Sequence, residues 1–161
     1  MFLNHCMDIN LMEHMGNALA KRFRGVRITK VLTAESSGIA LACFVARALD
    51  VPAVYAKKFQ TGYSAETHSF SLEKSYTLRV SKKYLDGDDV VLLVDDILSN
   101  GQAILSLLEL VSKAGGEVAG VGVAIEKAMR DGGRVLRRMG IRVEALATVE
   151  RIEGDRIILK D

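Results

Sequence analysis

The sequence contains no tryptophan, a single proline and only two cysteines among its 161 residues. Cys6 and Cys43 form no CxxC motif or Cys/His cluster, which argues against a structural zinc site and against a disulfide scaffold. No apolar run approaches the roughly 18 residues of a membrane-spanning helix. The first residues also lack the basic and apolar segments of a secretory signal. We therefore expect a cytoplasmic protein without a membrane segment.

The chain also lacks an excess of charge of either sign. It has 22 Lys and Arg against 20 Asp and Glu, which leaves a formal net charge of +2. A polybasic coat is therefore absent, and we expect no nucleic acid as a partner. Apolar residues make up 49% of the chain, the balance of an ordinary globular protein. With about 150 residues per domain, the length predicts one domain over residues 1–161.

Segments with strand character alternate with helical segments through the middle of the chain. The continuous apolar runs Val90–Val94 and Val118–Ile125 are typical of strands covered on both faces of a sheet. Helices are predicted over Gly38–Leu49 and Gln102–Ala114, and this alternation indicates an α/β fold with a largely parallel sheet. The other expected elements are a helix after Asp8, a further helix at Arg134–Met139, and strands at Ile28–Thr33, Ala53–Ala56, Arg142–Thr148 and Arg156–Leu159.

One stretch has no clear period. Between Lys57 and Ser75 the apolar pattern fades, and Gly, Ser, Thr and Gln accumulate. We expect a long mobile loop there that merges into a strand pair, with Tyr76–Val80 as its second member.

The segment Val90–Ala103 carries the strongest chemical signal. A buried strand is followed by the adjacent acids Asp95 and Asp96, and the short loop Ser99–Gly101 then opens a helix. Open α/β sheets bind ligands at the carboxyl ends of their strands, and the N–H groups of a helix N-terminus bind phosphate. Carboxylates beside that loop suit hydroxyl groups, so the segment predicts a site for a phosphorylated sugar. Alternatively, the acids are ordinary loop residues and Ser99 is only a helix cap.

Two further segments offer groups for phosphate. Ser36-Ser37-Gly38 also connects a strand to a helix N-terminus, although a plain serine cap would have the same sequence. Lys57 and Lys58 follow a predicted strand and would supply point charges for phosphate oxygens, unless they are a solvated pair at the strand end. The chain contains neither a Walker A loop nor a GxGxxG motif, so this is not a nucleotide-binding loop of those types.

Taken together, these segments resemble the type I phosphoribosyltransferases. Val91–Ala103 is similar to their ribose-5-phosphate signature, and its Ser-Asn-Gly-Gln-Ala loop is most similar to that of the xanthine phosphoribosyltransferases. The resemblance covers essentially the whole chain and implies the type I fold, a mainly parallel central sheet with helices on both faces and a small hood formed by the termini. The other matching segments follow in the family's order: Phe2–His5, Glu35–Ala40, Val51–Lys58 and Ile125–Lys127.

The resemblance implies a role for each matched residue. Asp95 and Asp96 would contact the ribose hydroxyls, and Lys57 and Lys58 would serve the pyrophosphate, often across a dimer interface. The 5-phosphate would be cradled by Ser99, Asn100, Gly101, Gln102 and Ala103, and pyrophosphate would be held by the amides of Ser36, Ser37 and Gly38. The base would lie against Asn4, Lys127 and Met129, where Met129 stands in place of a stacking aromatic residue of the xanthine enzymes.

The implied activity is transfer of ribose 5-phosphate from 5-phosphoribosyl 1-pyrophosphate to xanthine, which yields XMP and pyrophosphate in purine salvage. The resemblance also implies a homodimer and Mg²⁺ held through the substrate, with no metal ligands from the protein itself. Closure of Phe59–Ser75 would keep water from the sugar. Two alternatives stay open: transfer to adenine or another purine, against which Lys127 argues because adenine has no carbonyl oxygen, and a non-catalytic regulator that senses the same donor.

Overall fold

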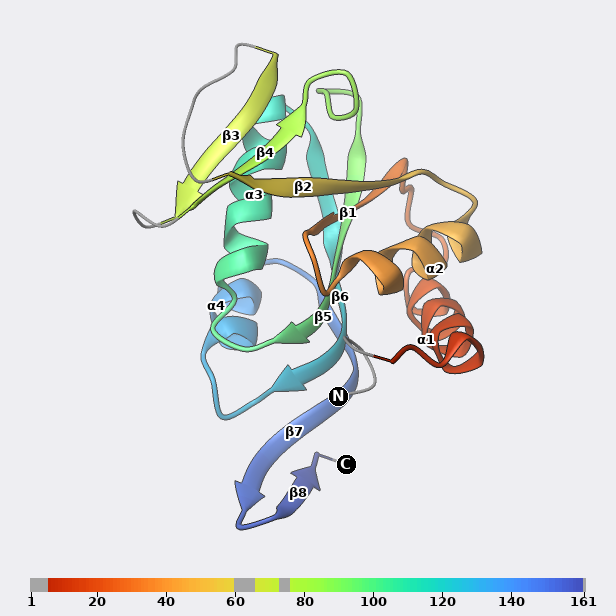
Figure 1. Cartoon of the computed structure of the whole chain (residues 1–161), viewed down its shortest axis with the longest axis vertical. Helices are drawn as coiled ribbons and strands as arrows, with labels where there is room; N and C mark the ends of the chain where they lie inside the picture. The colour runs from red at the N-terminus through yellow and green to blue at the C-terminus, as the bar shows by residue number, and fades with distance from the viewer. Residues whose placement is uncertain (1–5, 60–65, 73–75, 161) are drawn as a thin grey trace.

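The computed structural model describes residues 6–59, 66–72 and 76–160. Within these ranges, eight strands form one sheet in the order β3-β4-β2-β1-β5-β6-β7-β8 (Figure 1). The strands are β1 (Lys30–Ala34), β2 (Ala53–Phe59), β3 (Thr67–Leu72), β4 (Tyr76–Ser81), β5 (Val90–Leu98), β6 (Glu117–Lys127), β7 (Val143–Glu153) and β8 (Arg156–Leu159). The helices are α1 (Ile9–Arg22), α2 (Ile39–Leu49), α3 (Gln102–Ala114) and α4 (Gly132–Arg138).

The centre of the sheet is parallel, and antiparallel strands close both of its ends. β2, β1, β5, β6 and β7 pair in parallel. β4 pairs with β2, β3 with β4, and β8 with β7, each in antiparallel register. β1 has β2 on one side and β5 on the other. The chain therefore moves from β1 outward to β2 in one direction, and later returns past β1 to add β5 in the opposite direction. Such a reversal opens a crevice at the carboxyl ends of the strands, where ligands bind in sheets of this kind.

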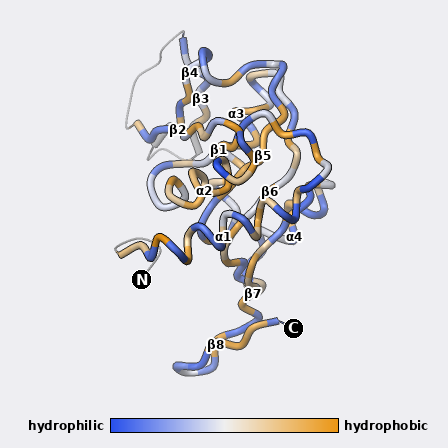
Figure 2. The backbone as a smooth tube through the Cα atoms, turned by 90° about the vertical axis from the view of Figure 1, so that its right-hand side faces the viewer, coloured by the Kyte–Doolittle hydropathy of each residue, from blue (hydrophilic) through white to orange (hydrophobic). Residues whose placement is uncertain are grey.

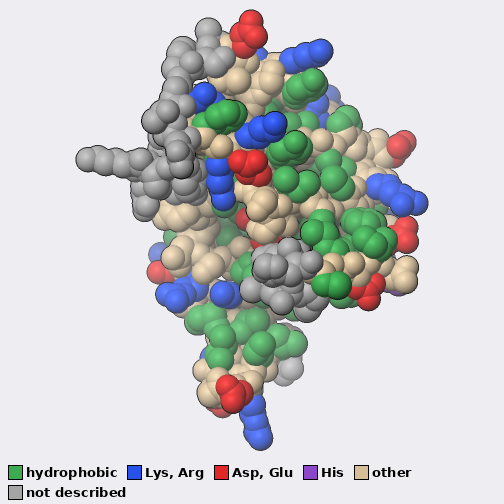
Figure 3. All heavy atoms as spheres, in the orientation of Figure 1, with side chains coloured by type: hydrophobic (Ala, Val, Ile, Leu, Met, Phe, Trp, Pro, Cys, Tyr) green, Lys and Arg blue, Asp and Glu red, His purple; other side chains and the backbone are tan. Residues whose placement is uncertain are grey.

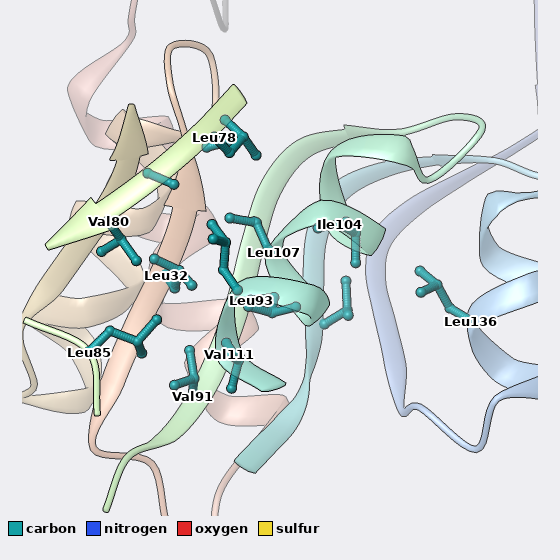
Figure 4. Packing of buried hydrophobic residues seen from close by; sticks show 14 of the residues in the cluster. Leu32, Leu78, Val80, Leu85, Val91, Leu93, Ile104, Leu107, Val111 and Leu136 are labelled. Carbon is teal, nitrogen blue, oxygen red and sulfur yellow. The ribbon is translucent and has the colours of Figure 1, made fainter. Parts of the chain in front are cut away.

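Helices cover both faces of this sheet, as predicted. On one face, Leu19 of α1, its C-cap Phe23 and Val45 of α2 are buried against Leu92 and Val94 of β5. On the other face, Leu107 and Val111 of α3 pack against Leu93, and Leu136 of α4 belongs to the same cluster (Figure 4). The continuous apolar run of β5 is explained by this double coverage, because alternate side chains of a strand point to opposite faces.

The structure corrects two expectations about element boundaries. β5 does not end at Val94 but continues through Asp95 and Asp96 to Leu98, because β6 pairs with it along that whole length. The expected mobile loop at Phe59–Ser75 is partly regular structure. β2 runs to Phe59, and Thr67–Leu72 is the strand that pairs with β4, while residues 60–65 and 73–75 lie outside the described residues.

The C-terminal part of the expected hood is a hairpin that projects from the body of the molecule (Figures 1 and 2). Its strands β7 and β8 expose the apolar side chains of Ile152, Ile157 and Leu159, and Figure 3 shows hydrophobic side chains gathered on this projection. Residues 1–5, the expected N-terminal contribution, lie outside the described residues. Among the residues that are described, no helix has the length and apolar character needed to cross a membrane.

Candidate active site

A cavity of about 280 Å³ lies at the N-terminus of α3. Gly101 is the N-cap of this helix in the left-handed conformation (φ 79°), and no side chain of the described residues caps the first turn. The first N–H groups of α3 therefore lack intrahelical partners and remain free to bind an anion. The cavity is lined by all five residues predicted to cradle the 5-phosphate together with neighbours from β5 and α3: Asp95, Ile97, Leu98, Ser99, Asn100, Gly101, Gln102, Ala103 and Ile104.

The acid pair is connected to the predicted pyrophosphate loop by a side-chain hydrogen bond. The Ser37 hydroxyl donates to Oδ1 of Asp96 over 3.0 Å, and the same oxygen accepts from the backbone N–H of Ile97 over 2.9 Å. Oδ1 of Asp95 accepts from the backbone N–H of Asp96 over 2.9 Å. Residues that are far apart in the sequence thus meet at the carboxyl ends of β1 and β5.

Gly38 brings the start of α2 directly against this pair. A Cβ on Gly38 would overlap the Thr33 hydroxyl oxygen and stand 2.9 Å from Oδ1 of Asp95. Only glycine permits this approach of the backbone. Gly38 is also the N-cap of α2, again without a side-chain cap, so a second helix N-terminus begins here, although the N–H of Ile39 donates to the carbonyl oxygen of Ser36 over 3.3 Å. The two carboxylates consequently lie between two helix N-termini.

The pKa of Asp95 is raised to about 7, chiefly because burial penalises its charged form. The negative charge of Asp96 raises the pKa further, and the positive charge of Lys58 opposes the shift. An acid pair of this kind attracts a cation or hydroxyl donors, since either would relieve the repulsion between the two carboxylates.

The two predicted lysines point in different directions. Lys58 is close enough to lower the pKa of Asp95, and its backbone N–H donates to Oε1 of Glu35 over 2.5 Å. Lys57, its neighbour on β2, lies over the ring of Tyr55 at 5.8 Å and lines a separate groove. Neighbouring residues of a strand alternate between the two faces of a sheet, so only Lys58 faces the acid pair of its own chain.

Two of the three residues predicted to contact the base, Lys127 and Met129, lie at the end of β6 and in the turn after it. Glu126 is paired with Leu98 in the β5–β6 ladder, so the half-buried Lys127 follows beside the beginning of the loop at Ser99. Met129 occupies the turn after β6 and is 40% exposed. Asn4 lies outside the described residues.

Sequence reasoning missed the residues that support these loops. Gly132 donates its N–H to the carbonyl oxygen of Ser99 over 3.0 Å and so holds the phosphate loop from outside. Glu126 is buried and forms two hydrogen bonds with Arg137. Two features of the sequence could have pointed to these residues. Gly132-Gly133 is a glycine pair at the start of a helix, and Glu126 is an acid inside an apolar strand.

No group of three or more His, Cys, Asp or Glu that could hold a metal is present in the part of the chain that the structure describes. Asp95 and Asp96 nevertheless supply carboxylate oxygens, which are the ligands that Mg²⁺ prefers. Mg²⁺ usually keeps several waters and is bound through one or two carboxylates together with substrate phosphates. The pair therefore fits a Mg²⁺ ion that arrives with a phosphorylated substrate.

Two curated proteins that are similar over nearly the whole chain are xanthine phosphoribosyltransferases. Xanthine phosphoribosyltransferase from Heliobacterium modesticaldum is 46% identical, with 98% of this chain and 86% of that protein covered. Xanthine phosphoribosyltransferase from Clostridium novyi is 43% identical, with 99% and 87% covered.

Solved structures agree on the architecture. Adenine phosphoribosyltransferase from Thermoanaerobacter pseudethanolicus superposes with a TM-score of 0.78 at 26% identity, with 88% of this chain and 82% of that chain covered. Adenine phosphoribosyltransferase from Rhodothermus marinus gives 0.74 at 29% identity, with 86% and 80% covered. The family described as phosphoribosyl transferase domain matches residues 9–137, which include both helix N-termini, the acid pair and Lys127. The chain therefore belongs to the phosphoribosyltransferase family and has its type I fold.

Proposed function

We propose that this phosphoribosyltransferase transfers ribose 5-phosphate from 5-phosphoribosyl 1-pyrophosphate to xanthine. The observation that carries the proposal is the placement of Asp95 and Asp96 between the N-termini of α2 and α3. The donor has a phosphate at one end, a pyrophosphate at the other and two vicinal hydroxyls between them. Its phosphate and pyrophosphate thus correspond to the two helix N-termini, and its hydroxyls correspond to the two carboxylates.

Each part of the donor has a stated partner in this proposal. The 5-phosphate binds the free N–H groups of Ser99–Ala103, and the pyrophosphate binds those of Ser36–Gly38. Asp95 and Asp96 accept hydrogen bonds from the ribose hydroxyls, and Lys58 supplies positive charge beside them. The base nitrogen then displaces pyrophosphate at the anomeric carbon, a reaction that depends on positioning and on charge stabilisation at the leaving group.

Mg²⁺ would arrive bound to the donor and neutralise charge on the pyrophosphate as it leaves, and the negative charge of Asp95 and Asp96 would favour the ion beside the ribose hydroxyls. The chain's own contribution is orientation. The hydrogen bond from Ser37 to Asp96 fixes the pyrophosphate loop relative to the ribose site, so both ends of the breaking bond are held by one network.

Xanthine is the proposed base for two reasons. The similar curated proteins at 43% and 46% identity are named for it. Lys127, half-buried beside the phosphate loop, carries an ammonium group that can donate to a purine carbonyl oxygen. The similar solved structures are named for adenine instead, which makes adenine the competing base.

The test offers xanthine, hypoxanthine, guanine and adenine in parallel with the donor and Mg²⁺, and measures pyrophosphate release. We expect the fastest release with xanthine. Faster release with adenine would replace the proposed base and leave the donor site intact. No release with any of the four bases would contradict the proposal as a whole.

We also propose that the enzyme is a homodimer formed through the uncovered face of β2 and β4. Tyr55, Phe59 and Tyr84 are each at least 40% exposed there and border a groove of about 610 Å³. Arg79, stacked on Phe59 at 4.7 Å, is buried in this groove, and its Nε and Nη2 have no hydrogen-bond partner among the described residues. Lys57 lies on the same face. A second copy would cover these aromatic side chains. Lys57, which does not face the acid pair of its own chain, would then lie against the partner copy.

Light scattering tests the dimer. We expect a mass of about twice 17.6 kDa for the parent protein and a monomer for Tyr84→Asp, since a charge in an apolar interface is costly. Met139→Asp, at another exposed apolar side chain, is the control and should stay dimeric. A fully active parent monomer would contradict this arrangement.

A further inference from the structure

The phosphate loop is held on its outer side by the first residue of α4. The N–H of Gly132 donates to the carbonyl oxygen of Ser99 over 3.0 Å. A Cβ on Gly132 would overlap that oxygen and stand 2.7 Å from the backbone nitrogen of Gly101. A Cβ on Gly101 would in turn stand 3.1 Å from Cα of Gly132. The two backbones are therefore in direct contact, with no room for a side chain.

The start of α4 is itself fixed by an ion pair at the end of β6. Arg137 donates to both carboxylate oxygens of Glu126, over 2.6 and 2.7 Å. The Glu126 side chain is only 8% exposed, whereas that of Arg137 is 46% exposed. A Cβ on Gly133 would overlap Oε1 of Glu126, so the helix begins directly on this carboxylate. Two-point pairing of this kind fixes orientation as well as distance.

The same carboxylate connects the two halves of the site. Glu126 lies opposite Leu98 in the β5–β6 ladder, and Lys127, the proposed base-contacting residue, is its next neighbour in the chain. The contacts therefore run without a break from the end of β6, through Arg137 and the start of α4, to the loop at Ser99–Gly101.

We propose that Gly132, Gly133, Glu126 and Arg137 are positioning residues for the 5-phosphate of the donor. They touch no substrate in this proposal. They set the position of the Ser99–Gly101 backbone, whose N–H groups bind the phosphate. The inference rests on the proposed function of that loop and adds the residues that hold the loop in its binding geometry.

The first experiment compares binding of two fragments of the donor by calorimetry. Ribose 5-phosphate reports on the loop at Ser99–Gly101, and pyrophosphate with Mg²⁺ reports on the loop at Ser36–Gly38. Because displacement of a binding group by about 1 Å can cost on the order of 100-fold, we expect Gly132→Ala to weaken ribose 5-phosphate binding by at least about tenfold. Pyrophosphate binding should stay within about twofold, because Gly132 does not contact that loop.

A matched control and a conservative variant accompany this change. Gly87→Ala is the control, because Gly87 lies in another turn and its Cβ would meet only ordinary contacts at 3.6 Å and beyond. Glu126→Gln keeps the shape of the side chain and removes its charge, so it decides the question if Gly132→Ala does not fold. We expect Glu126→Gln to raise KM for the donor several-fold, with a smaller change in kcat, as expected for a weakened binding loop.

A double-variant cycle tests the path through the ion pair. Gly133→Ala should impair ribose 5-phosphate binding because its methyl group displaces Glu126. Glu126→Ala removes the carboxylate with which that methyl collides most severely, and the other close atom, Nη1 of Arg137 at 2.7 Å, is the end of a flexible side chain that can move aside. The double variant should therefore bind no worse than Glu126→Ala alone, a clear departure from additivity.

The outcomes separate this inference from the function on which it rests. If the parent protein binds no ribose 5-phosphate, the proposed function of the loop is wrong. If the parent binds it and the Gly132 and Glu126 variants bind it equally well, the positioning role is wrong. Equal losses for ribose 5-phosphate and pyrophosphate would indicate a general loosening of the fold and would likewise overturn the inference.

Discussion

The donor half of the proposed site differs from the base half in which part of the polypeptide faces the ligand. On the donor side, backbone N–H groups of two helix N-termini flank carboxylates that a hydrogen bond and a close glycine contact hold in place. On the base side, the described residues are the half-buried Lys127 and the exposed Met129. The first half is made from backbone and core strands, and the second from individual side chains at the edge of the sheet.

This difference suggests how one fold accommodates different bases. A binding loop made of backbone tolerates few substitutions, because glycine contacts such as that of Gly38 leave no space for a Cβ. A side chain at an exposed strand end can change without disturbing the core. Similar proteins named for xanthine and similar structures named for adenine are what such a division leads us to expect.

The largest expected effect is on the donor side. Asp96→Asn should lower kcat by about 100- to 1,000-fold, because it removes a charge in a site where electrostatic stabilisation dominates. The fold should survive, since the asparagine oxygen can still accept from Ser37 and Ile97. Steady-state turnover with a thermal melt checks both points. Asp88→Asn, at an exposed turn, is the control. Turnover near that of the parent would remove Asp96 from the proposed machinery.

A smaller effect is expected on the base side. Lys127→Ala should raise KM for xanthine by about 10- to 100-fold, because it removes one polar contact to the base. KM for the donor should change little, and Lys82→Ala, at an exposed turn, is the control. Titration of each substrate against the other measures both constants. If donor binding were lost instead, the two halves would be assigned the wrong way round.

The contrast between backbone and side chain can be tested within the donor half. Ser37→Ala leaves every backbone N–H of the loop in place and removes only the hydrogen bond to Asp96. We expect pyrophosphate binding to weaken by only about three- to tenfold, the net value of one typical intramolecular hydrogen bond. Calorimetry with pyrophosphate and Mg²⁺ measures it. If Ser37→Ala weakened pyrophosphate affinity by about 100-fold or more, the loop would bind chiefly through its side chains and not through its backbone.

The smallest effect is on stability. The pKa of Asp95 is raised to about 7 from an ordinary 3.8, so the folded protein holds its proton more tightly than the unfolded chain does. The stability that this proton contributes is fully present below about pH 4 and is lost as pH rises through 7. The ligand-free protein should therefore lose stability between pH 4 and pH 8. Asp95→Asn should flatten this slope and raise Tm at pH 8, by about 2–4 °C for each kcal/mol relieved. Melting curves across this range check the sign, and a steeper slope in the variant would contradict it.

The sequence was informative where local signals and tertiary packing agree. α3 could be predicted from end to end, because Gly101 precedes it and Gly115 ends it. The cavity residues at its N-terminus followed from the same signal. The parallel sheet and its coverage by helices followed from the uninterrupted apolar strands.

What could not be predicted depends on strand pairing. β5 continues through the two acids only because β6 accompanies it, and a single sequence does not reveal the length of a partner strand. Lys57 and Lys58 face opposite sides of β2 because neighbours in a strand alternate, but which of them faces the acid pair depends on how β2 pairs within the sheet. Gly132 supports the phosphate loop through a hydrogen bond to Ser99, and these two residues come together only in the folded chain, so the sequence alone does not reveal the contact.

The hydrogen bond between Ser37 and Asp96 also has a consequence for biosynthesis. The two residues are 59 positions apart, and β2 is synthesised long before β5. During translation, β1 gains one neighbour early while its other edge stays unpaired until Val90 and its successors emerge from the ribosome. An open edge of this kind is a template for aggregation. A nascent chain arrested before β5 would carry the serine loop without its acids, so ligands could stabilise the enzyme only late in its folding.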